Sequence, residues 1–278
     1  MILTRPELPD FDNPPVIEVA MGVQFETIPS LRTAQLGMLW TEFRDEFPKC
    51  EEHPPRKPSF EHFGVREPTK IEVHVERGIP VPKLWFINEA GTRLIQVQQD
   101  RFVHNWRKMD EKDEYPRYEN VREKFMETLD IFRRFIDREG LGELVPNQCE
   151  LTYVNHIFQY QGWDRYGQID KLFTVWESKY SDLFLSEPEE AGFFARYIIK
   201  SDKEEQLGRL YINVNPSVRS EDRTQIVLMN LTARGKPLGD GIEGVSTFLD
   251  IGRSWIVRGF ASITSKEMHQ HWRRTDEP

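Results

Sequence analysis

The chain has 278 residues, with 37 Lys and Arg against 46 Asp and Glu, and a formal net charge of −9. Aromatic residues make up 12% of it, which excludes a wholly disordered protein although 30% of the residues are charged. No apolar run approaches the roughly 20 residues that span a bilayer, and 1–15 lacks the apolar centre of a signal peptide. The acidic balance disfavours non-specific nucleic-acid binding, which depends on Lys and Arg. We therefore expect a cytoplasmic, globular protein.

The first half of the chain predicts strands alternating with helices. Alternating, β-branched segments are typical of strands, and apolar residues three and four apart are typical of one helix face. In chain order we expect a proline-rich lead-in at 1–15, a strand at 16–25, a helix at 31–47, a loop at 50–68, strands at 71–76, 84–88 and 94–99, and a helix at 119–138.

The same order of elements begins again near Cys149. The patterns predict a strand at 149–158, a helix at 169–184, strands at 193–200, 209–215 and 225–233, and a long helix from 245. Thr264 to Glu267 form a capping-box pattern, which predicts a short final helix that ends at Trp272.

This order, β-α-β-β-β-α twice, indicates an α+β fold with an internal duplication. We expect a lead-in at 1–15 and two halves at 16–142 and 149–278 that form one compact unit. Their strands should form antiparallel sheet with the helices packed on one face. The other sheet face would then be open, and binding is expected there.

The motifs of common enzymes are missing from the sequence. It contains no GxxxxGK[ST], HExxH, GxSxG or SxxK, and its one GxGxxG match, Gly239 to Gly244, is acidic and is expected to form a turn that leads into a helix. The seven histidines form no i,i+4 pair, and Cys50 and Cys149 lie in no CxxC pair, so we expect two reduced thiols, no metal and no cofactor. No pair of carboxylates is placed for acid–base chemistry. The sequence therefore favours a non-catalytic protein.

A polar and aromatic cluster follows the strand at 94–99. Asp100, Arg101, Asn105 and Arg107 would lie at a sheet end, where they could hold a polar ligand or a partner. The alternative is structural, because an Asp–Arg pair and an amide often tie down an irregular strand exit.

Amide side chains at alternate positions form a second candidate site. Side chains alternate along a strand, so Tyr153 and Asn155 share one face while His156 lies on the other. By the same count, we place the following residues on one amide-rich sheet face: Gln96, Gln98, Asn213, Asn215, Asn230 and Thr232. Such a face suits peptide backbone, nucleobase edges or a polar small molecule. The alternative is an ordinary solvated sheet face.

Four stretches of the chain carry a family resemblance: PPVIEVAMGVQF (14–25), LIQVQQDRFVHNWR (94–107), LTYVNHI (151–157) and RGFASITSKEMHQHW (258–272). In these motifs and their order the chain resembles a sporadically distributed family of uncharacterised bacterial proteins of about this length. The resemblance implies a soluble bacterial protein from mobile or defence-linked genes, and it brings no catalytic residues. The family usually has a His beside the Trp of its long C-terminal helix, where this chain has Arg253-Ser254-Trp255.

These observations favour a binding protein that recognises a protein, a peptide or a small polar ligand on its open sheet face. Antiviral defence is the setting that the resemblance suggests. One alternative is a hydrolase or nuclease that uses Asp100, His104 or His156 between the halves. Another is direct nucleic-acid binding, for which the candidates are four arginines: Arg101, Arg107, Arg196 and Arg209.

Overall fold

The computed structural model describes residues 8–64, 80–177, 179–182 and 184–276. The first half contains β1 (Val16–Phe25), α1 (Thr33–Phe43), β2 (Lys49–His53), β3 (Lys83–Ile87), β4 (Arg93–Gln98), β5 (Arg101–Arg107) and α2 (Arg117–Arg138). The second half contains β6 (Pro146–Phe158), the 3-10 turn η1 (Gln159–Gln161), α3 (Ile169–Leu172), β7 (Phe193–Lys200), β8 (Gln206–Val218), β9 (Gln225–Gly235), α4 (Gly241–Ile263) and α5 (Lys266–His271).

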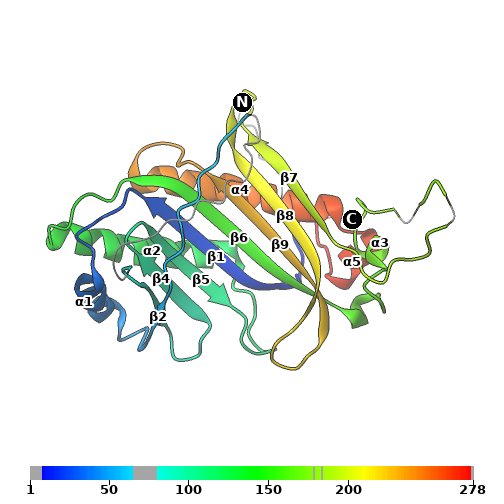
Figure 1. Cartoon of the computed structure of the whole chain (residues 1–278), viewed down its shortest axis with the longest axis horizontal. Coiled ribbons are helices and arrows are strands. Elements are labelled where there is room, and N and C mark those ends of the chain that lie inside the picture. The colour runs from blue at the N-terminus through cyan, green and yellow to red at the C-terminus, as the bar shows by residue number, and fades with distance from the viewer. Residues whose placement is uncertain (1–7, 65–79, 178, 183, 277–278) are drawn as a thin grey trace.

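The nine strands of the described residues belong to one antiparallel sheet, in the order β2-β3-β4-β5-β1-β6-β9-β8-β7 (Figure 1). The expected α+β class, an antiparallel sheet carrying helices, is therefore confirmed. The first strand of each half lies at the centre, where β1 pairs with β6 and Met21 faces Leu151. From this pair the sheet extends outward through β5, β4, β3 and β2 on one side and through β9, β8 and β7 on the other.

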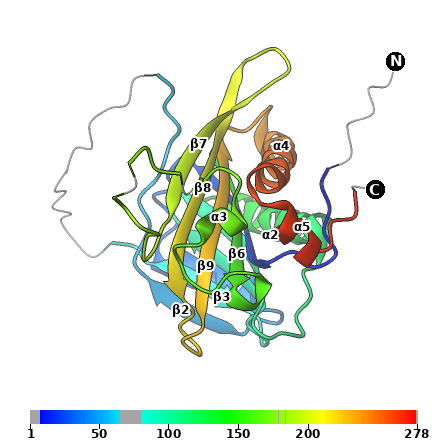
Figure 2. The same cartoon turned by 90° about the vertical axis from the view of Figure 1, so that its right-hand side faces the viewer.

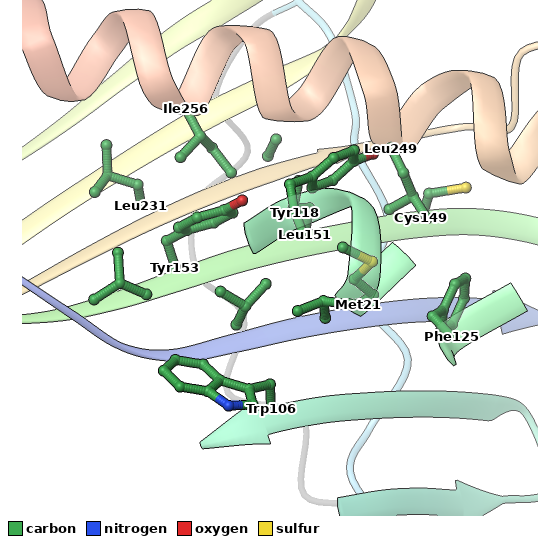
Figure 3. Packing of buried hydrophobic residues seen from close by; sticks show 14 of the residues in the cluster. Met21, Trp106, Tyr118, Phe125, Cys149, Leu151, Tyr153, Leu231, Leu249 and Ile256 are labelled. Carbon is green, nitrogen blue, oxygen red and sulfur yellow. The ribbon is translucent and has the colours of Figure 1, made fainter. Parts of the chain in front are cut away.

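One face of the sheet carries the hydrophobic core. Val19, Met21 and Val23 alternate along β1 toward the long helices α2 and α4, which lie on the same side of the sheet (Figure 2). Phe102 of β5 stacks on Phe132 of α2 with ring centroids 5.1 Å apart. Figure 3 shows the side chains of this layer packed between strands and helices. Burying so much aromatic and aliphatic surface stabilises the sheet–helix contact.

The end of the chain matches the capping pattern read from the sequence. Ser265 is the N-cap of α5, and its hydroxyl accepts a hydrogen bond from the backbone N–H of Met268 at 3.3 Å. Trp272 follows the helix and is fully buried. The predicted short helix is confirmed.

Three expectations about single elements were wrong. The loop expected at 50–68 begins with strand β2, and 101–107 is the regular strand β5 rather than an irregular strand exit. The helix expected at 169–184 shrinks to α3, after which Phe173 adopts an extended backbone and pairs with Thr264. Of the apolar residues beyond α3, Trp176 packs against the core, but Val175 is half-exposed and Tyr180 is exposed, so their spacing does not form one buried helix face. The strand expected at 71–76 lies outside the described residues.

A buried histidine makes the stability of this core depend on pH. His104 of β5 faces α2, where its Nδ1 lies 3.1 Å from the hydroxyl of Thr128. Burial, followed by the charges of Arg93 and Lys124, lowers the pKa of His104 to about 3. An unfolded histidine has a pKa near 6.5, so below that pH the unfolded state binds a proton that the folded state refuses.

We therefore expect wild-type stability to fall as the pH drops through 6.5, by about 2 kcal/mol between pH 7.5 and pH 5 from this group alone. Urea unfolding at several pH values measures how steeply the free energy of unfolding depends on pH. His104→Gln should flatten it, while His62→Gln, at an exposed position, should leave it unchanged. Equal slopes for the wild type and His104→Gln would contradict this assignment.

Candidate functional site

The sheet face opposite the helices is built by strict alternation along the central strands. The register places Gln96 opposite Val103, Gln98 opposite Arg101, and Arg101 opposite Gln24. These side chains point away from the core because their neighbours along each strand point into it. Four predicted site residues, Gln96, Gln98, Arg101 and Asn105, thus share this face and line one cavity.

A stretch of backbone without helix or strand, residues 54–64, crosses this face (Figure 2); we call it the crossing segment. Its Arg56 N–H donates to Gln98 Oε1 at 3.0 Å, and Gln98 Nε2 donates back to the Arg56 carbonyl at 2.8 Å. The Ser59 N–H donates to Gln24 Oε1 at 2.9 Å. Side-chain amides of the sheet therefore make the hydrogen bonds to this backbone that a neighbouring strand would otherwise make.

The far end of the crossing segment is anchored by a buried carboxylate. The Glu61 side chain is 2% exposed, and it accepts hydrogen bonds from Arg209 Nη1 at 2.5 Å and from the Tyr211 hydroxyl at 2.7 Å. Arg234 Nη1 lies 3.7 Å away. Burial and the hydrogen bond to Glu61 raise the pKa of Tyr211. The segment is thus tied to β8 and β9, in the half of the chain to which it does not belong.

Between the crossing segment and the central strands lies a polar cavity of about 230 Å³, which we call the open-face cavity. Arg56, Lys83 and Arg101 line it together with Glu150. Glu150 accepts hydrogen bonds from Arg234 Nε at 2.7 Å and from Arg56 Nη1 at 3.4 Å. Within the described part of the chain, neither Arg101 nor Lys83 has a carboxylate within 4 Å.

The cavity therefore carries positive charge that its own carboxylates do not balance. Burial, then the charges of Arg56 and Arg101, lower the pKa of Lys83. Burial would raise the pKa of Glu150, but Arg234, Arg56 and Arg101 together lower it, so this carboxylate is ionised and already shared. Burial raises the pKa of Glu18, against the effect of its hydrogen bond from Asn105.

One wall of the cavity also holds an amide without a partner. Gln148 is 3% exposed, and neither its Nε2 nor its Oε1 has a hydrogen-bond partner among the residues that the structure describes. Each hydrogen bond that a buried amide fails to make lowers the stability of the folded protein by about 1–3 kcal/mol.

Two predicted residues lie on the opposite face, which corrects the expected placement. Tyr153 is paired with Leu231 in the core layer, and Asn155 is 1% exposed and donates from Nδ2 to the Met229 carbonyl at 3.1 Å. Alternation groups the residues of one strand correctly, but it does not say which group faces the helices. Here the amide of Asn155 belongs to the helix side.

The remaining predicted residues lie outside the open-face cavity. Asp100 sits in the β4–β5 turn and accepts a hydrogen bond from Gln98, and Arg107 donates from Nη2 to the Gly91 carbonyl at 2.9 Å. Three amides lie on the open face farther out, over β8 and β9: Asn213, Asn215 and Asn230. The expected amide patch is therefore divided.

The residues proposed for an enzyme do not form one site. His104 points into the core beneath α2, whereas His156 lies on the open side of β6 by alternation with Thr152 and Val154. In the described ranges, no three His, Cys, Asp or Glu side chains are grouped so that they could hold a metal ion. Of the four arginines proposed to bind nucleic acid, Arg209 is already paired with Glu61.

Sequence reasoning missed Arg56, Lys83 and Glu150. Arg56 lies in what was read as a plain loop, Lys83 begins an edge-side strand, and Glu150 follows the buried Cys149 in β6. Nothing in their local sequence marks them, since they meet only when β6, β3 and the crossing segment come together.

No family model matches the chain, and no curated protein or solved structure matches it. Within the described residues, no helix has the length and apolar character needed to cross a membrane. The function of this chain must therefore be inferred from the geometry of the open-face cavity.

We expect Glu61→Ala to release the crossing segment, because it leaves the largely buried Arg209 without its carboxylate, while Arg234 keeps Glu150. Hydrogen–deuterium exchange should accelerate at the amides of Arg56 and Ser59, and the free energy of unfolding should fall by about 3 kcal/mol. Glu46→Ala is the matched control, because it breaks an exposed pair with Arg93 and should cost below about 1 kcal/mol. Unchanged exchange in Glu61→Ala would show that the segment is held by other contacts.

Proposed function

We propose that this protein is a non-catalytic binding protein whose open-face cavity recognises an anionic group, a carboxylate or a phosphate, on a protein, a peptide or a small polar ligand. The observation that carries the proposal is Arg101, a residue only 8% exposed that lines the cavity and has no carboxylate within 4 Å among the described residues. A buried charge is costly unless it is paired, so an anion from outside would complete the site.

The donors left over support the same ligand class. A guanidinium has five N–H donors, and toward the described residues Arg101 uses only Nη2, which donates to Gln24 Oε1 at 2.6 Å and to the Lys57 carbonyl at 3.4 Å. Lys83 Nζ contributes a second cation, whose nearest aromatic contact is the Trp85 ring at 5.2 Å. Charge-assisted bonds from an arginine and a lysine suit a carboxylate or phosphate oxygen.

The neutral amides support recognition rather than chemistry. Gln96 Nε2 donates to Asn105 Oδ1 at 2.9 Å, and Asn105 in turn donates to Glu18, so these side chains hold one another in place. The Gln148 amide is available for a polar group next to the anion. A peptide C-terminus has an anionic end next to a group that can hydrogen-bond to an amide, and a small metabolite can have the same arrangement.

We propose that the two halves descend from one β-α-β-β-β-α unit, supported by the central β1–β6 pair and by the matching outward orders β5-β4-β3 and β9-β8-β7, beyond which the first half adds β2. The free thiols of Cys50 and Cys149 support a cytoplasmic location. A role in a bacterial defence or mobile-element system, with a protein partner, is proposed from the family resemblance alone.

Lys83→Gln and Arg101→Gln test the binding proposal. Isothermal titration with inorganic phosphate and with tri-alanine should show binding that weakens with salt, and tri-alanine amide should bind more weakly than tri-alanine. Each variant should lose roughly tenfold in affinity, as expected for a hydrogen bond to a charged group.

Arg196→Gln is the matched control, because Arg196 lies on the same face but on the edge strand β7. It should keep wild-type affinity. Lys83→Gln should also retain the melting temperature or raise it, since it relieves repulsion among the cavity's cations. Equal loss of affinity in Arg196→Gln, or equal binding of the peptide and its amide, would contradict the proposal.

A further inference from the structure

A second cavity, of about 350 Å³, lies on the helix side of the sheet. We call it the helix-side cavity. Its walls come from the N-terminal segment Leu8 to Val16, from the residues at the start of α2, from α4, and from β6 and β9. The apolar part of its lining includes Pro14, Val16, Leu231, Ile256, Val257 and Phe260. Ligand cavities in proteins have this size and this mainly apolar lining.

The cavity is also lined by a few polar groups whose hydrogen-bonding capacity is not fully used. The hydroxyls of Tyr115 and Tyr153 lie 2.9 Å apart, and Tyr153 projects from β6 toward α4 (Figure 3). One phenol donates to the other, which leaves the hydroxyl hydrogen of the accepting tyrosine without an acceptor among the described residues. Asn155 uses its Nδ2 toward Met229, and its Oδ1 has no donor in the same described part of the chain. The lining therefore offers one donor and one acceptor.

The charged residues around this cavity are already neutralised. Arg117 Nη1 lies 3.2 Å from Asp10 and donates to the Phe11 carbonyl at 2.9 Å. Arg253 Nη1 donates to Glu119 at 2.7 Å. Burial raises the pKa of Tyr153 to about 12 and that of Tyr115 well above its usual value, so both phenols stay neutral. The helix-side cavity thus differs from the open-face cavity in having no uncompensated charge.

The N-terminal segment closes the cavity and is fastened to the end of the chain. The Asp12 N–H donates to the Arg273 carbonyl at 3.0 Å, and the Asn13 N–H donates to the Trp272 carbonyl at 3.1 Å. Phe11 packs edge-on against Phe260 with ring centroids 5.3 Å apart. A wall held by both backbone bonds and aromatic contacts keeps the cavity formed without a ligand.

We infer that the helix-side cavity binds a small, uncharged, largely apolar ring compound that carries one hydroxyl or amide group. That group would accept the unused tyrosine hydrogen and donate to Asn155 Oδ1, while the ring fills the apolar part. An apolar cavity of about 150 Å³ can hold benzene, so this one has room for a two-ring compound. This site is independent of the anion site, because the sheet separates them.

Ligand-observed NMR titration with 2-naphthol, naphthalene and 2-naphthoate tests this site. We expect 2-naphthol to bind the wild-type protein and 2-naphthoate to bind more weakly, because its charge has no free counter-charge. The double variant Tyr115→Phe with Tyr153→Phe removes both hydroxyls, and with them the free hydroxyl hydrogen, and should weaken 2-naphthol about fivefold, as for one neutral hydrogen bond. The same variant should leave naphthalene binding unchanged.

Val257→Trp fills the cavity from α4 and should abolish binding of both 2-naphthol and naphthalene. Gln96→Ala, on the opposite face, should bind 2-naphthol as the wild type does. If Val257→Trp fails to fold by circular dichroism, the comparison of the double Tyr115→Phe and Tyr153→Phe variant with wild type decides alone. The inference would be overturned by no saturable binding of 2-naphthol, by binding that survives Val257→Trp, by equal affinity of the double variant for 2-naphthol, or by tighter binding of 2-naphthoate.

Discussion

The antiparallel pairing of β1 with β6 is the contact from which the other features follow. It joins the first strand of each half, and its register sets Met21 opposite Leu151 and Gly22 opposite Glu150. Side chains have a period of two along a strand, so this one register determines which residues of the neighbouring strands face the helices. Shifting it by one residue would exchange the hydrophobic layer with the polar one. The dry core and the polar face are therefore two consequences of the same pairing.

The two faces of the sheet are covered in physically different ways. On the helix side, α2 and α4 bury aromatic and aliphatic side chains such as Phe102 and Phe132. On the open side, the crossing segment is held mainly by hydrogen bonds from its backbone to side-chain amides and by the buried Glu61. Buried amides are costly unless they are bonded, so Gln24 and Gln98 and the segment's backbone depend on one another. Much of the polarity of this face is structural, and among the described residues that line its cavity, Arg101, Lys83 and Gln148 are left for a ligand.

Each face also encloses a cavity, and the two differ in charge. The open-face cavity gathers Arg56, Lys83 and Arg101 around a carboxylate that is already shared. The helix-side cavity is lined by apolar groups and neutral phenols, and its charges at the rim are paired. The difference follows from their positions, since one lies among the outward residues of the strands and the other among the inward ones. One sheet can thus present two ligand chemistries without any shared side chain.

By itself, the sequence determined most of the local structure. Alternation predicted the central strands, helical spacing predicted α2 and α4, and a capping pattern predicted α5, because these signals arise within a few neighbouring residues. Helical spacing also predicted 169–184, where it failed, because beyond α3 the apolar residues do not share one buried face. Local alternation was sufficient to group Gln96 with Gln98, whereas Arg101 and Asn105 were expected at a strand end and lie instead within β5.

Tertiary structure alone decided which face each group occupies and which distant residues join it. Tyr153 and Asn155 share a face as expected, yet that face is the helix side, because alternation is symmetric with respect to the two faces. Arg56, Lys83 and Glu150 meet only where a crossing segment, an outer strand and a central strand converge. Such convergence depends on pairings between residues far apart in the chain, and no local pattern of charge or hydropathy records them.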